Sequence, residues 1–223
     1  MKTVVVALPG REYSGTFLTN WSETLMLMVQ KGYKITMINE YSSFVSFSRM
    51  KTLGLSVLRG ATQVPFGGQL DYDVWLTIDS DIVFTPHQVI ELIEDVDKHP
   101  VVSGLYRMTD LKHYAAVKEW DMEYFKKHGS FEFLKVDTLD TTEKYMKVAY
   151  NGMGFFACRK GVIENLKYPY FSYPLIEMET EDGKLLRDMC SEDVAFCKNL
   201  KDVGYSVIVN TSLRVGHEKT LVI

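Results

Sequence analysis

The residues best suited to chemistry in this sequence are two aspartates, Asp79 and Asp81, which stand two positions apart at the end of an apolar run. The run 74–78 is typical of a central strand that is buried on both faces. Ligands of open α/β sheets bind at the carboxyl ends of strands, and extended residues two apart project to the same side. We therefore expect both carboxylates to face one crevice and to share a hard cation, Mn²⁺ or Mg²⁺, with substrate phosphates. The alternative is a solvated strand-to-helix turn without metal.

Three further segments carry groups that would assist such a site. His217 follows the last expected strand and offers an imidazole for a Mn²⁺ ligand set, with an ordinary packed histidine as the alternative. Glu192 and Asp193 open a helix after Ser191. Either is a candidate general base for an acceptor hydroxyl, or both simply stabilise the helix N-terminus. Arg11 lies in a turn after the first strand, where its guanidinium would suit phosphate or only face solvent.

The elements that must position these residues alternate between strands and helices in the first half of the chain. Apolar and β-branched runs predict strands at 3–8, 34–39, 74–78 and 101–105. Helical spacing predicts helices at 15–30, 44–58 and 86–98, with Gly32 ending the first and Pro86 in the first turn of the third. Residues 62–70 are expected to form a loop. This order implies parallel β-α-β units with helices on both faces of the sheet.

The second half follows a different pattern. Short strands, partly antiparallel, are expected at 114–120, 131–136, 146–149, 155–158 and 205–209, and an amphipathic helix at 190–203. The aromatic stretch 168–174 is expected mostly in the core, with a sugar-stacking wall as the alternative. We expect one α/β domain over 1–223, with a Rossmann-like, parallel-rich sheet and a smaller mixed part. Residues 1–105 would form its nucleotide-binding half and 106–223 the half that completes the metal site and receives the acceptor. The apolar end, 221–223, indicates a piece of a longer polypeptide.

Composition argues against several classes of protein. The 223 residues include 25 Lys and Arg against 29 Asp and Glu, a net charge of −4, whereas a sequence-independent nucleic-acid binder carries a basic excess. Three cysteines without a C-x-x-C spacing argue against disulfides or structural zinc and favour a reducing, cytoplasmic compartment. No apolar run approaches the roughly 18–20 residues that cross a membrane, so no membrane insertion is expected.

The motifs together resemble those of GT-A-fold glycosyltransferases. An apolar strand followed by Asp-x-Asp resembles the family's DXD motif, which holds a divalent metal on the diphosphate of a nucleotide sugar. In overall look the chain resembles the glycosyltransferase domains of the large chlorella viruses, which would make it a viral protein of the host cytoplasm. The other matching segments follow the family's order along nearly the whole chain: Leu8-Pro9-Gly10-Arg11 at the nucleoside, Ser48-Arg49 at the nucleotide, Asn151-Gly152-Met153-Gly154 between donor and acceptor, Ser191-Glu192-Asp193 at the acceptor, and Gly216-His217 as a late metal ligand.

This resemblance implies a metal-dependent transferase that moves a hexose or deoxyhexose from a nucleotide sugar, UDP being expected, to a hydroxyl of a glycan or glycoprotein acceptor. Asp81 and His217 would bind Mn²⁺ or Mg²⁺, and Asp79 would share the metal directly or through water, or hold the ribose. Asp193 or Glu192 would be the base of an inverting reaction, whereas the Asn-Gly-x-Gly segment favours retention. The implied donor-binding residues are Leu8, Pro9, Gly10, Arg11, Ser48, Arg49, Asp79, Ser80, Gly152, Met153 and Gly154. For Arg49 the alternative is a pair with a carboxylate of the core.

Two other functions stay open from the sequence. Residues 79–83 also match the Asp-x-Asp-x-Thr/Val motif of haloacid-dehalogenase-type Mg²⁺-dependent phosphatases, in which the first aspartate is the nucleophile. That motif normally follows the first strand, whereas two β-α units precede it here. A non-catalytic nucleotide- or carbohydrate-binding module would bind the same ligands without turnover. The first loop lacks the G-x-G-x-x-G pattern, which argues against a dinucleotide oxidoreductase.

Overall fold

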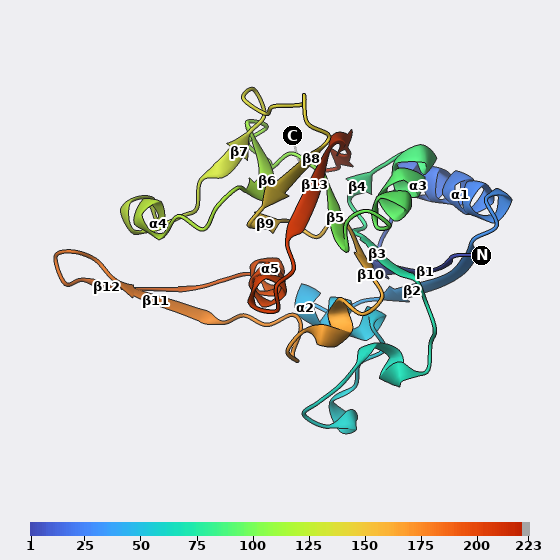
Figure 1. The fold of residues 1–223 in the computed structure, drawn as a ribbon, viewed down its shortest axis with the longest axis horizontal. Helices are drawn as coiled ribbons and strands as arrows, with labels where there is room; N and C mark the ends of the chain where they lie inside the picture. The colour runs from blue at the N-terminus through green and yellow to red at the C-terminus, as the bar shows by residue number, and fades with distance from the viewer. Residues whose placement is uncertain (220–223) are drawn as a thin grey trace.

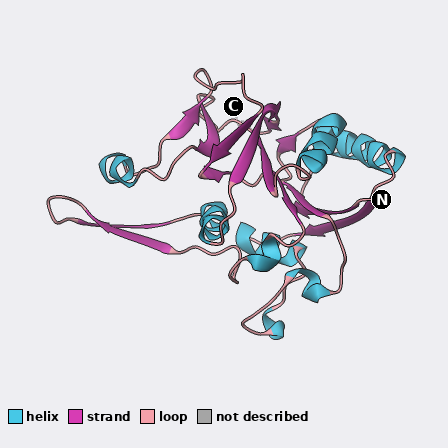
Figure 2. Ribbon diagram, in the orientation of Figure 1, coloured by secondary structure: helices cyan, strands magenta, loops and turns pink. Residues whose placement is uncertain are grey.

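The computed structural model describes residues 1–219 as a mixed α/β fold built on a seven-stranded sheet (Figures 1 and 2). Residues 220–223, which include the apolar end noted above, lie outside the described residues. The strand order across the sheet is β2-β1-β3-β10-β5-β13-β8. The bounds are β1 (Thr3–Pro9), β2 (Lys34–Glu40), β3 (Val74–Ile78), β5 (Val101–Leu105), β8 (Tyr145–Val148), β10 (Phe155–Arg159) and β13 (Val207–Arg214).

Strand direction confirms the expected fold class and adds one feature that the sequence did not predict. β1 pairs in parallel with β2 and β3, and β5 pairs in parallel with β13. β10 is inserted between β3 and β5 and runs antiparallel to both, and β8 is an antiparallel edge strand on β13. The parallel β-α-β series of the first half is therefore interrupted by a strand from the second half.

Helices cover both faces of the sheet, as expected. Helices α1 (Gly15–Gln30) and α3 (Pro86–Asp95) lie on one face, and α2 (Val45–Thr52) and α5 (Glu192–Asp202) lie on the other (Figure 1). The residues of β1 alternate between the two cores: Val4 and Val6 pack in the cluster that contains Phe17 of α1, and Val5 packs in the cluster that contains Phe196 of α5. This period-two alternation is what a strand buried on both faces requires.

Local sequence signals fix where these helices begin and end. The side chain of Ser14 accepts a hydrogen bond from the backbone N–H of Phe17 at the start of α1. Thr85 and Gln88 form a reciprocal capping box at the start of α3. The second helix is shorter than expected, because Gly54 adopts φ +66° two residues after α2 ends. The chain then continues through two short 3₁₀ turns, Val57–Arg59 and Pro65–Gly68.

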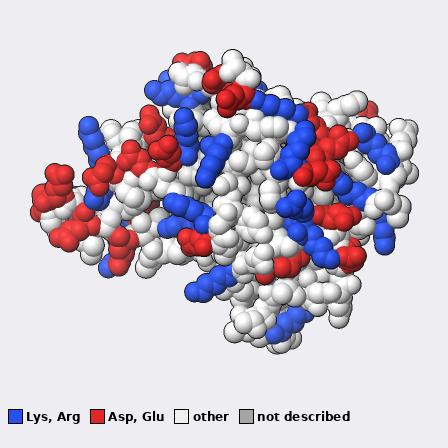
Figure 3. Space-filling view, in the orientation of Figure 1, with Lys and Arg blue, Asp and Glu red and all other residues white. Residues whose placement is uncertain are grey.

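Smaller elements complete the fold, and most of them were not predicted. A two-stranded pair, β4 (Ile82–Val83) with β14 (Gly216–His217), borders the main sheet, and β7 (Phe133–Lys135), β6 (His113–Val117) and β9 (Tyr150–Asn151) form a three-stranded sheet. Helix α4 (Met122–His128) and the 3₁₀ turn Ile163–Asn165 lie in the second half. The hairpin β11 (Leu175–Glu179) and β12 (Leu185–Met189) extends away from the body in Figure 1, and acidic side chains gather at that end in Figure 3.

One sequence expectation about side chains is also met. Tyr170 and Phe171 of the aromatic stretch are buried, and Phe171 stacks on Phe196 of α5. The three cysteines are free thiols and buried. Within residues 1–219, none of the helices has the length and apolar character needed to cross a membrane.

Candidate nucleotide and metal site

The loop after β1 and the turn after β3 lie against each other at one edge of the sheet. The two strands are parallel neighbours, so their carboxyl ends meet there. A Cβ on Gly10 would lie only 2.7 Å from the Cβ of Ser80, so the close approach of the two segments requires glycine at that position. Asp79 donates its backbone N–H to the carbonyl oxygen of Gly154, 2.9 Å away, which ties the turn to β10. The structure thus brings the predicted nucleotide loop to the Asp-Ser-Asp turn.

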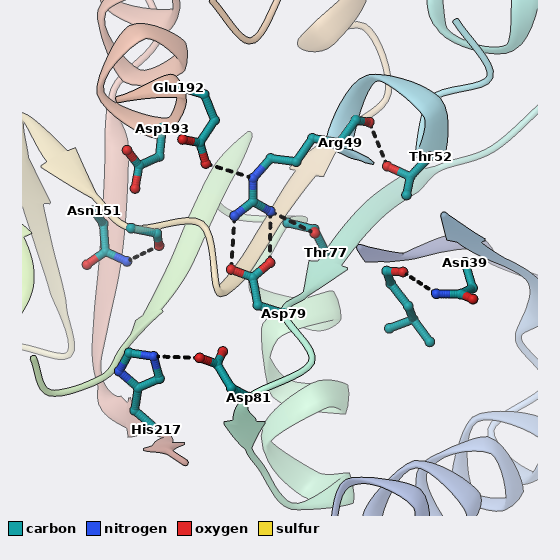
Figure 4. Close-up of polar contacts among 12 residues, drawn as sticks. Asn39, Arg49, Thr52, Thr77, Asp79, Asp81, Asn151, Glu192, Asp193 and His217 are labelled. Atoms are coloured by element: carbon teal, nitrogen blue, oxygen red, sulfur yellow. Dashed lines mark hydrogen bonds and ion pairs between the residues drawn. The ribbon is translucent and has the colours of Figure 1, made fainter. Parts of the chain in front are cut away.

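Asp79 is held by a buried arginine. The two terminal nitrogens of Arg49 lie 2.9 Å from the two carboxylate oxygens of Asp79, a bidentate pair, and its Nε lies 3.2 Å from Glu192 (Figure 4). The Arg49 side chain is only 3% exposed. Burial lowers the pKa of Arg49, but Asp79 and Glu192 outweigh burial and shift it upward. One permanent cation therefore neutralises part of a two-carboxylate cluster.

Asp79 and Asp81 have different protein partners, Arg49 for Asp79 and His217 for Asp81. The physical reason is that β3 ends at Ile78, and the backbone N–H of Ile82 bonds to the carbonyl of Asp79, 3.1 Å away. The two aspartates thus lie in a turn, where the period-two rule for extended residues no longer applies.

Asp81 meets His217 across the small β4–β14 pair. The antiparallel register places His217 opposite Ile82, and Nε2 of His217 lies 3.1 Å from Oδ2 of Asp81 (Figure 4). The other ring nitrogen, Nδ1, lies 2.9 Å from the backbone carbonyl of Arg107. A carbonyl and an ionised carboxylate both only accept, so both ring nitrogens carry a hydrogen here and the hydrogen bond to Asp81 raises the pKa of His217. A metal on Nε2 would take the place of that hydrogen, while Nδ1 keeps its bond to the carbonyl. The ring also packs edge-on against Tyr106, which fixes its orientation.

The carboxylate of Asp81 is ionised at neutral pH. Burial raises its pKa, but hydrogen bonds from His217 and Lys219 outweigh burial and lower the pKa to about 2. The Nζ of Lys219 lies 2.6 Å from the same oxygen that faces His217. Asp81 thus presents an anionic oxygen at the surface of the site, with a side chain that is 40% exposed.

The geometry of Asp81 and His217 fits a divalent metal. Two neighbouring ligands about 2.1 Å from an octahedral ion lie about 3 Å apart, which is close to the observed separation of 3.1 Å. A histidine ligand that donates its second N–H to a backbone carbonyl is the usual outer arrangement of a metal site. Within the described residues, no group of three or more potential ligands is present. The remaining ligands would come from phosphate and water, as Mg²⁺ sites commonly require.

Replacing His217 by alanine tests this pair of residues. We expect about 10–100-fold weaker Mn²⁺ affinity, the range typical of losses around a metal centre. Isothermal titration of Mn²⁺ into the UDP-loaded protein would measure the change. The matched control is His87→Ala, which removes an exposed histidine from the first turn of α3. Equal Mn²⁺ affinity in the wild type and His217→Ala would remove His217 from the ligand set.

The two acidic residues at the start of α5 have different surroundings. Glu192 is buried and bound to Arg49, and burial together with the nearby Asp193 raises its pKa although Arg49 opposes the shift. Asp193 is half-buried and accepts hydrogen bonds from the hydroxyls of Tyr150, 2.9 Å away, and Ser191. Ser191 is the helix N-cap residue, but its side chain makes no capping bond to the backbone. Within residues 1–219, Glu192 is paired with a cation, Arg49, whereas Asp193 forms no ion pair.

Residues 151–154 are buried and closely packed. A Cβ on Gly152 would lie 2.0 Å from the hydroxyl oxygen of Tyr106, and one on Gly154 would lie 3.0 Å from both Ile82 and Tyr106. Met153 is fully buried in the core. The side-chain amide of Asn151 donates to the carbonyl of Gly104, 3.0 Å away. Packing against Tyr106 is thus sufficient to explain both glycines.

The first loop is organised by a residue that sequence reasoning missed. Asn39, at the end of β2, donates its amide to the carbonyls of Leu8, 2.8 Å away, and Gly10, 2.9 Å away. The one clue in the sequence is its position, because Asn39 stands near the end of an expected strand and so at the same edge of the sheet as the loop. Asn39 also donates to the hydroxyl of Tyr13, and burial of that hydroxyl raises the pKa of Tyr13 to about 12.

The other predicted nucleotide residues lie around this loop. Arg11 is exposed, with its guanidinium 5.9 Å from the centre of the Tyr41 ring. Ser48 is buried in α2, where its hydroxyl accepts the backbone N–H of Ser42, 2.7 Å away. Ser48 and Arg49 therefore bind protein groups in this structure, whereas Arg11 stays open to a ligand.

The chain resembles solved structures in fold but not in sequence. No protein-family model matches it, and no curated protein matches its sequence. It is similar to A197 from STIV, with 17% identity, a TM-score of 0.55 and coverage of 99% of this chain and 87% of that one. It is also similar to TarS 1–349 of S. aureus, solved in complex with UDP-GlcNAc, with 12% identity and a TM-score of 0.51; all of this chain aligns, and it spans 60% of that one.

At such low identity these likenesses concern architecture alone. They agree with the sheet order and with the helices on both faces described above. The chain therefore has the mixed α/β, GT-A-like fold that its sequence predicted.

Proposed function

We propose that this protein is a metal-dependent glycosyltransferase that moves a hexose or deoxyhexose from a UDP-sugar to a hydroxyl of a glycan or glycoprotein acceptor. The observation that carries the proposal is the pair of Asp81 and His217, with Nε2 aimed at an ionised carboxylate 3.1 Å away, beside the glycine loop after β1. TarS, which has a similar fold, was solved with UDP-GlcNAc, a ligand of the proposed class.

In the proposed complex, the donor spans the edge of the sheet from the β1 loop to Asp81. The loop Leu8–Arg11 and the exposed Tyr41 ring would face the nucleoside, and Asp79, fixed by Arg49, would lie between nucleoside and diphosphate. Asp81 and His217 would hold Mn²⁺ or Mg²⁺. When bound, the ion supplies charge stabilisation for the departing diphosphate. An acidic protein can therefore bind an anionic donor without a basic surface.

The transfer step needs a base for the acceptor, and Asp193 has the better position for it. The acceptor oxygen attacks the anomeric carbon, while the bond from that carbon to the diphosphate oxygen breaks and its electron pair leaves with UDP. The hydroxyl proton passes to the carboxylate of Asp193, which the hydroxyls of Tyr150 and Ser191 orient. Glu192 is less suited to this role because its carboxylate is already paired with Arg49.

This assignment corresponds to inversion at the anomeric carbon. Retention was favoured by the Asn-Gly-x-Gly segment, which was expected to line the donor–acceptor site. Because Gly152 and Gly154 are explained by close packing against Tyr106, the segment no longer favours retention. We therefore include inversion, with Asp193 as base, in the proposal.

Replacing Asp193 by asparagine tests the role of the base. We expect transfer from the UDP-sugar to fall about 10²–10⁴-fold, the usual contribution of general base catalysis, while UDP affinity changes less than about twofold. The assay is release of UDP in the presence of acceptor and Mn²⁺, with Asp188→Asn, an exposed carboxylate of β12, as the control. Full activity in Asp193→Asn would exclude it as the base, and loss of folding would support a structural role at the start of α5.

The phosphatase alternative receives less support from the site. Its nucleophile would be Asp79, but both oxygens of Asp79 are hydrogen-bonded to a buried arginine. Steady Mg²⁺-dependent hydrolysis of p-nitrophenyl phosphate without any sugar nucleotide would nevertheless favour the phosphatase. Tight binding of a UDP-sugar without turnover in the presence of acceptors would favour the non-catalytic module.

A further inference from the structure

A cationic cavity of about 440 Å³ opens beside His217. Its walls are the segment that follows β5 and the turn between β13 and β14. Arg107, Arg214 and Lys219 line it together with His217, and none of its described lining residues is acidic. Apolar side chains, among them Leu111 and Tyr114, form the rest of the wall.

The two arginines of this cavity are exposed and available to a ligand. Arg214 donates its Nε–H to the carbonyl of Thr211, 3.1 Å away, and within residues 1–219 its terminal nitrogens make no hydrogen bond. Across residues 1–219, neither Arg107 nor Arg214 forms an ion pair with a carboxylate. Lys219 differs, because its Nζ is bound to Asp81. The planar forks of two arginines are the donors that bind a phosphate group best.

The position of the two arginines in the fold explains why they face the same space. Arg214 is in register with Leu105 at the end of β5, and Val215 donates its N–H to the carbonyl of Leu105. Arg107 follows two residues later and holds His217 through its own carbonyl oxygen. Both guanidiniums therefore project from adjacent strand ends whose backbone also fixes His217.

The cavity lies on the side of Asp81 and His217 that faces away from the loop Leu8–Arg11. In Figure 4, Asn39, which organises that loop, and His217 lie on opposite sides of Asp79 and Asp81. A donor that runs from the loop to Asp81 would therefore end where the cavity begins. On the face drawn in Figure 3, basic and acidic side chains are interspersed.

We propose that Arg107 and Arg214 bind a phosphate group carried by the acceptor. This inference rests on the proposed transferase function, and it narrows the acceptor to a phosphorylated molecule whose hydroxyl lies near Asp81 and Asp193. The competing occupant is the diphosphate of the donor itself, and the test below separates the two.

The test uses inorganic phosphate as the probe and the full chain as the protein. Isothermal titration is expected to show saturable phosphate binding that weakens at least about tenfold in Arg107→Gln and in Arg214→Gln. The matched control, Arg159→Gln, removes an exposed arginine at the opposite edge of the sheet and should change phosphate affinity less than about twofold. Thermal unfolding of the variants checks that each is folded, which we expect because all three side chains are exposed.

A second titration separates acceptor from donor. UDP with Mg²⁺ should bind Arg107→Gln and Arg214→Gln within about twofold of the wild type, and phosphate should still bind the UDP-loaded protein. The inference would be overturned by absent phosphate binding to the wild type or by unchanged phosphate binding in both variants. It would also be overturned if UDP affinity fell in parallel with phosphate affinity, or if UDP and phosphate competed for the protein. Failure of the wild type to bind UDP with Mg²⁺ would instead overturn the proposed function, while the phosphate titration would still report on the cavity.

Discussion

Replacing Arg49 by methionine is expected to destabilise the fold by about 3–5 kcal/mol, because the change leaves two carboxylates near one another without their shared cation. Asp79 lies 2.9 Å and Glu192 lies 3.2 Å from the guanidinium, and the arginine is 3% exposed. A typical domain has a net stability of only about 5–15 kcal/mol, so this single change would remove a large part of it. Urea unfolding followed by circular dichroism would measure the difference.

Two controls accompany this variant. Arg11→Met removes an exposed arginine from the neighbouring loop and should leave the urea midpoint nearly unchanged. Arg49→Met combined with Glu192→Gln removes one of the two unpaired charges and should recover part of the lost stability. An Arg49→Met protein as stable as the wild type would show that the three-residue cluster does not contribute to holding α2, β3 and α5 together.

Replacing Asp81 by asparagine is expected to remove the metal-dependent part of UDP binding. The change removes the anionic oxygen that faces Nε2 of His217. The loss of metal affinity should exceed the roughly 10–100-fold loss that is typical when a residue that only supports a metal ligand is replaced. Isothermal titration of UDP in Mn²⁺ and in EDTA would show equal affinities for Asp81→Asn, whereas the wild type would bind far more tightly in Mn²⁺.

The matched control for this variant is Asp71→Asn. Asp71 is an exposed carboxylate that pairs with Lys160 and lies before β3, at the opposite end of that strand. Its replacement should leave the Mn²⁺ dependence intact. A persistent Mn²⁺ dependence in Asp81→Asn would contradict the assignment of Asp81 as a metal ligand.

The sequence predicted the first half of the fold well because its signals are local. The apolar run of β1, Pro86 in the first turn of α3, and Gly32 after α1 are each signals that act within a few residues. β10 shows the opposite case. Its apolar run identifies a strand, but its place between β3 and β5, and its antiparallel direction, depend on pairings with residues more than 50 positions away.

The candidate site shows the same difference between contacts that the sequence predicted and contacts that it did not. The pairing of Asp81 with His217 was expected and was found, because both residues follow strands that end at one edge of the sheet. A carboxylate partner for Arg49 was one of two alternatives, but the sequence did not identify Asp79 as that partner, because the contact joins α2 to the turn after β3 and no spacing in the sequence encodes it. Asn39 was missed because its role is to bind backbone carbonyls of the β1 loop, and such a role has no short motif.

The central proposal is that the edge of the sheet beside Asp81 binds a nucleotide sugar through a divalent metal. A thermal-unfolding panel of UDP-, GDP-, TDP- and CMP-sugars, each with Mn²⁺ and with EDTA, tests it most directly. At a ligand concentration of about 100 Kd, binding adds about 2.7 kcal/mol, which raises the Tm of a chain this size by roughly 5–10 °C. We expect that rise with a UDP-sugar in Mn²⁺ and its loss in EDTA. No stabilisation by any of these nucleotide sugars in Mn²⁺, or equal stabilisation in EDTA, would contradict the proposal.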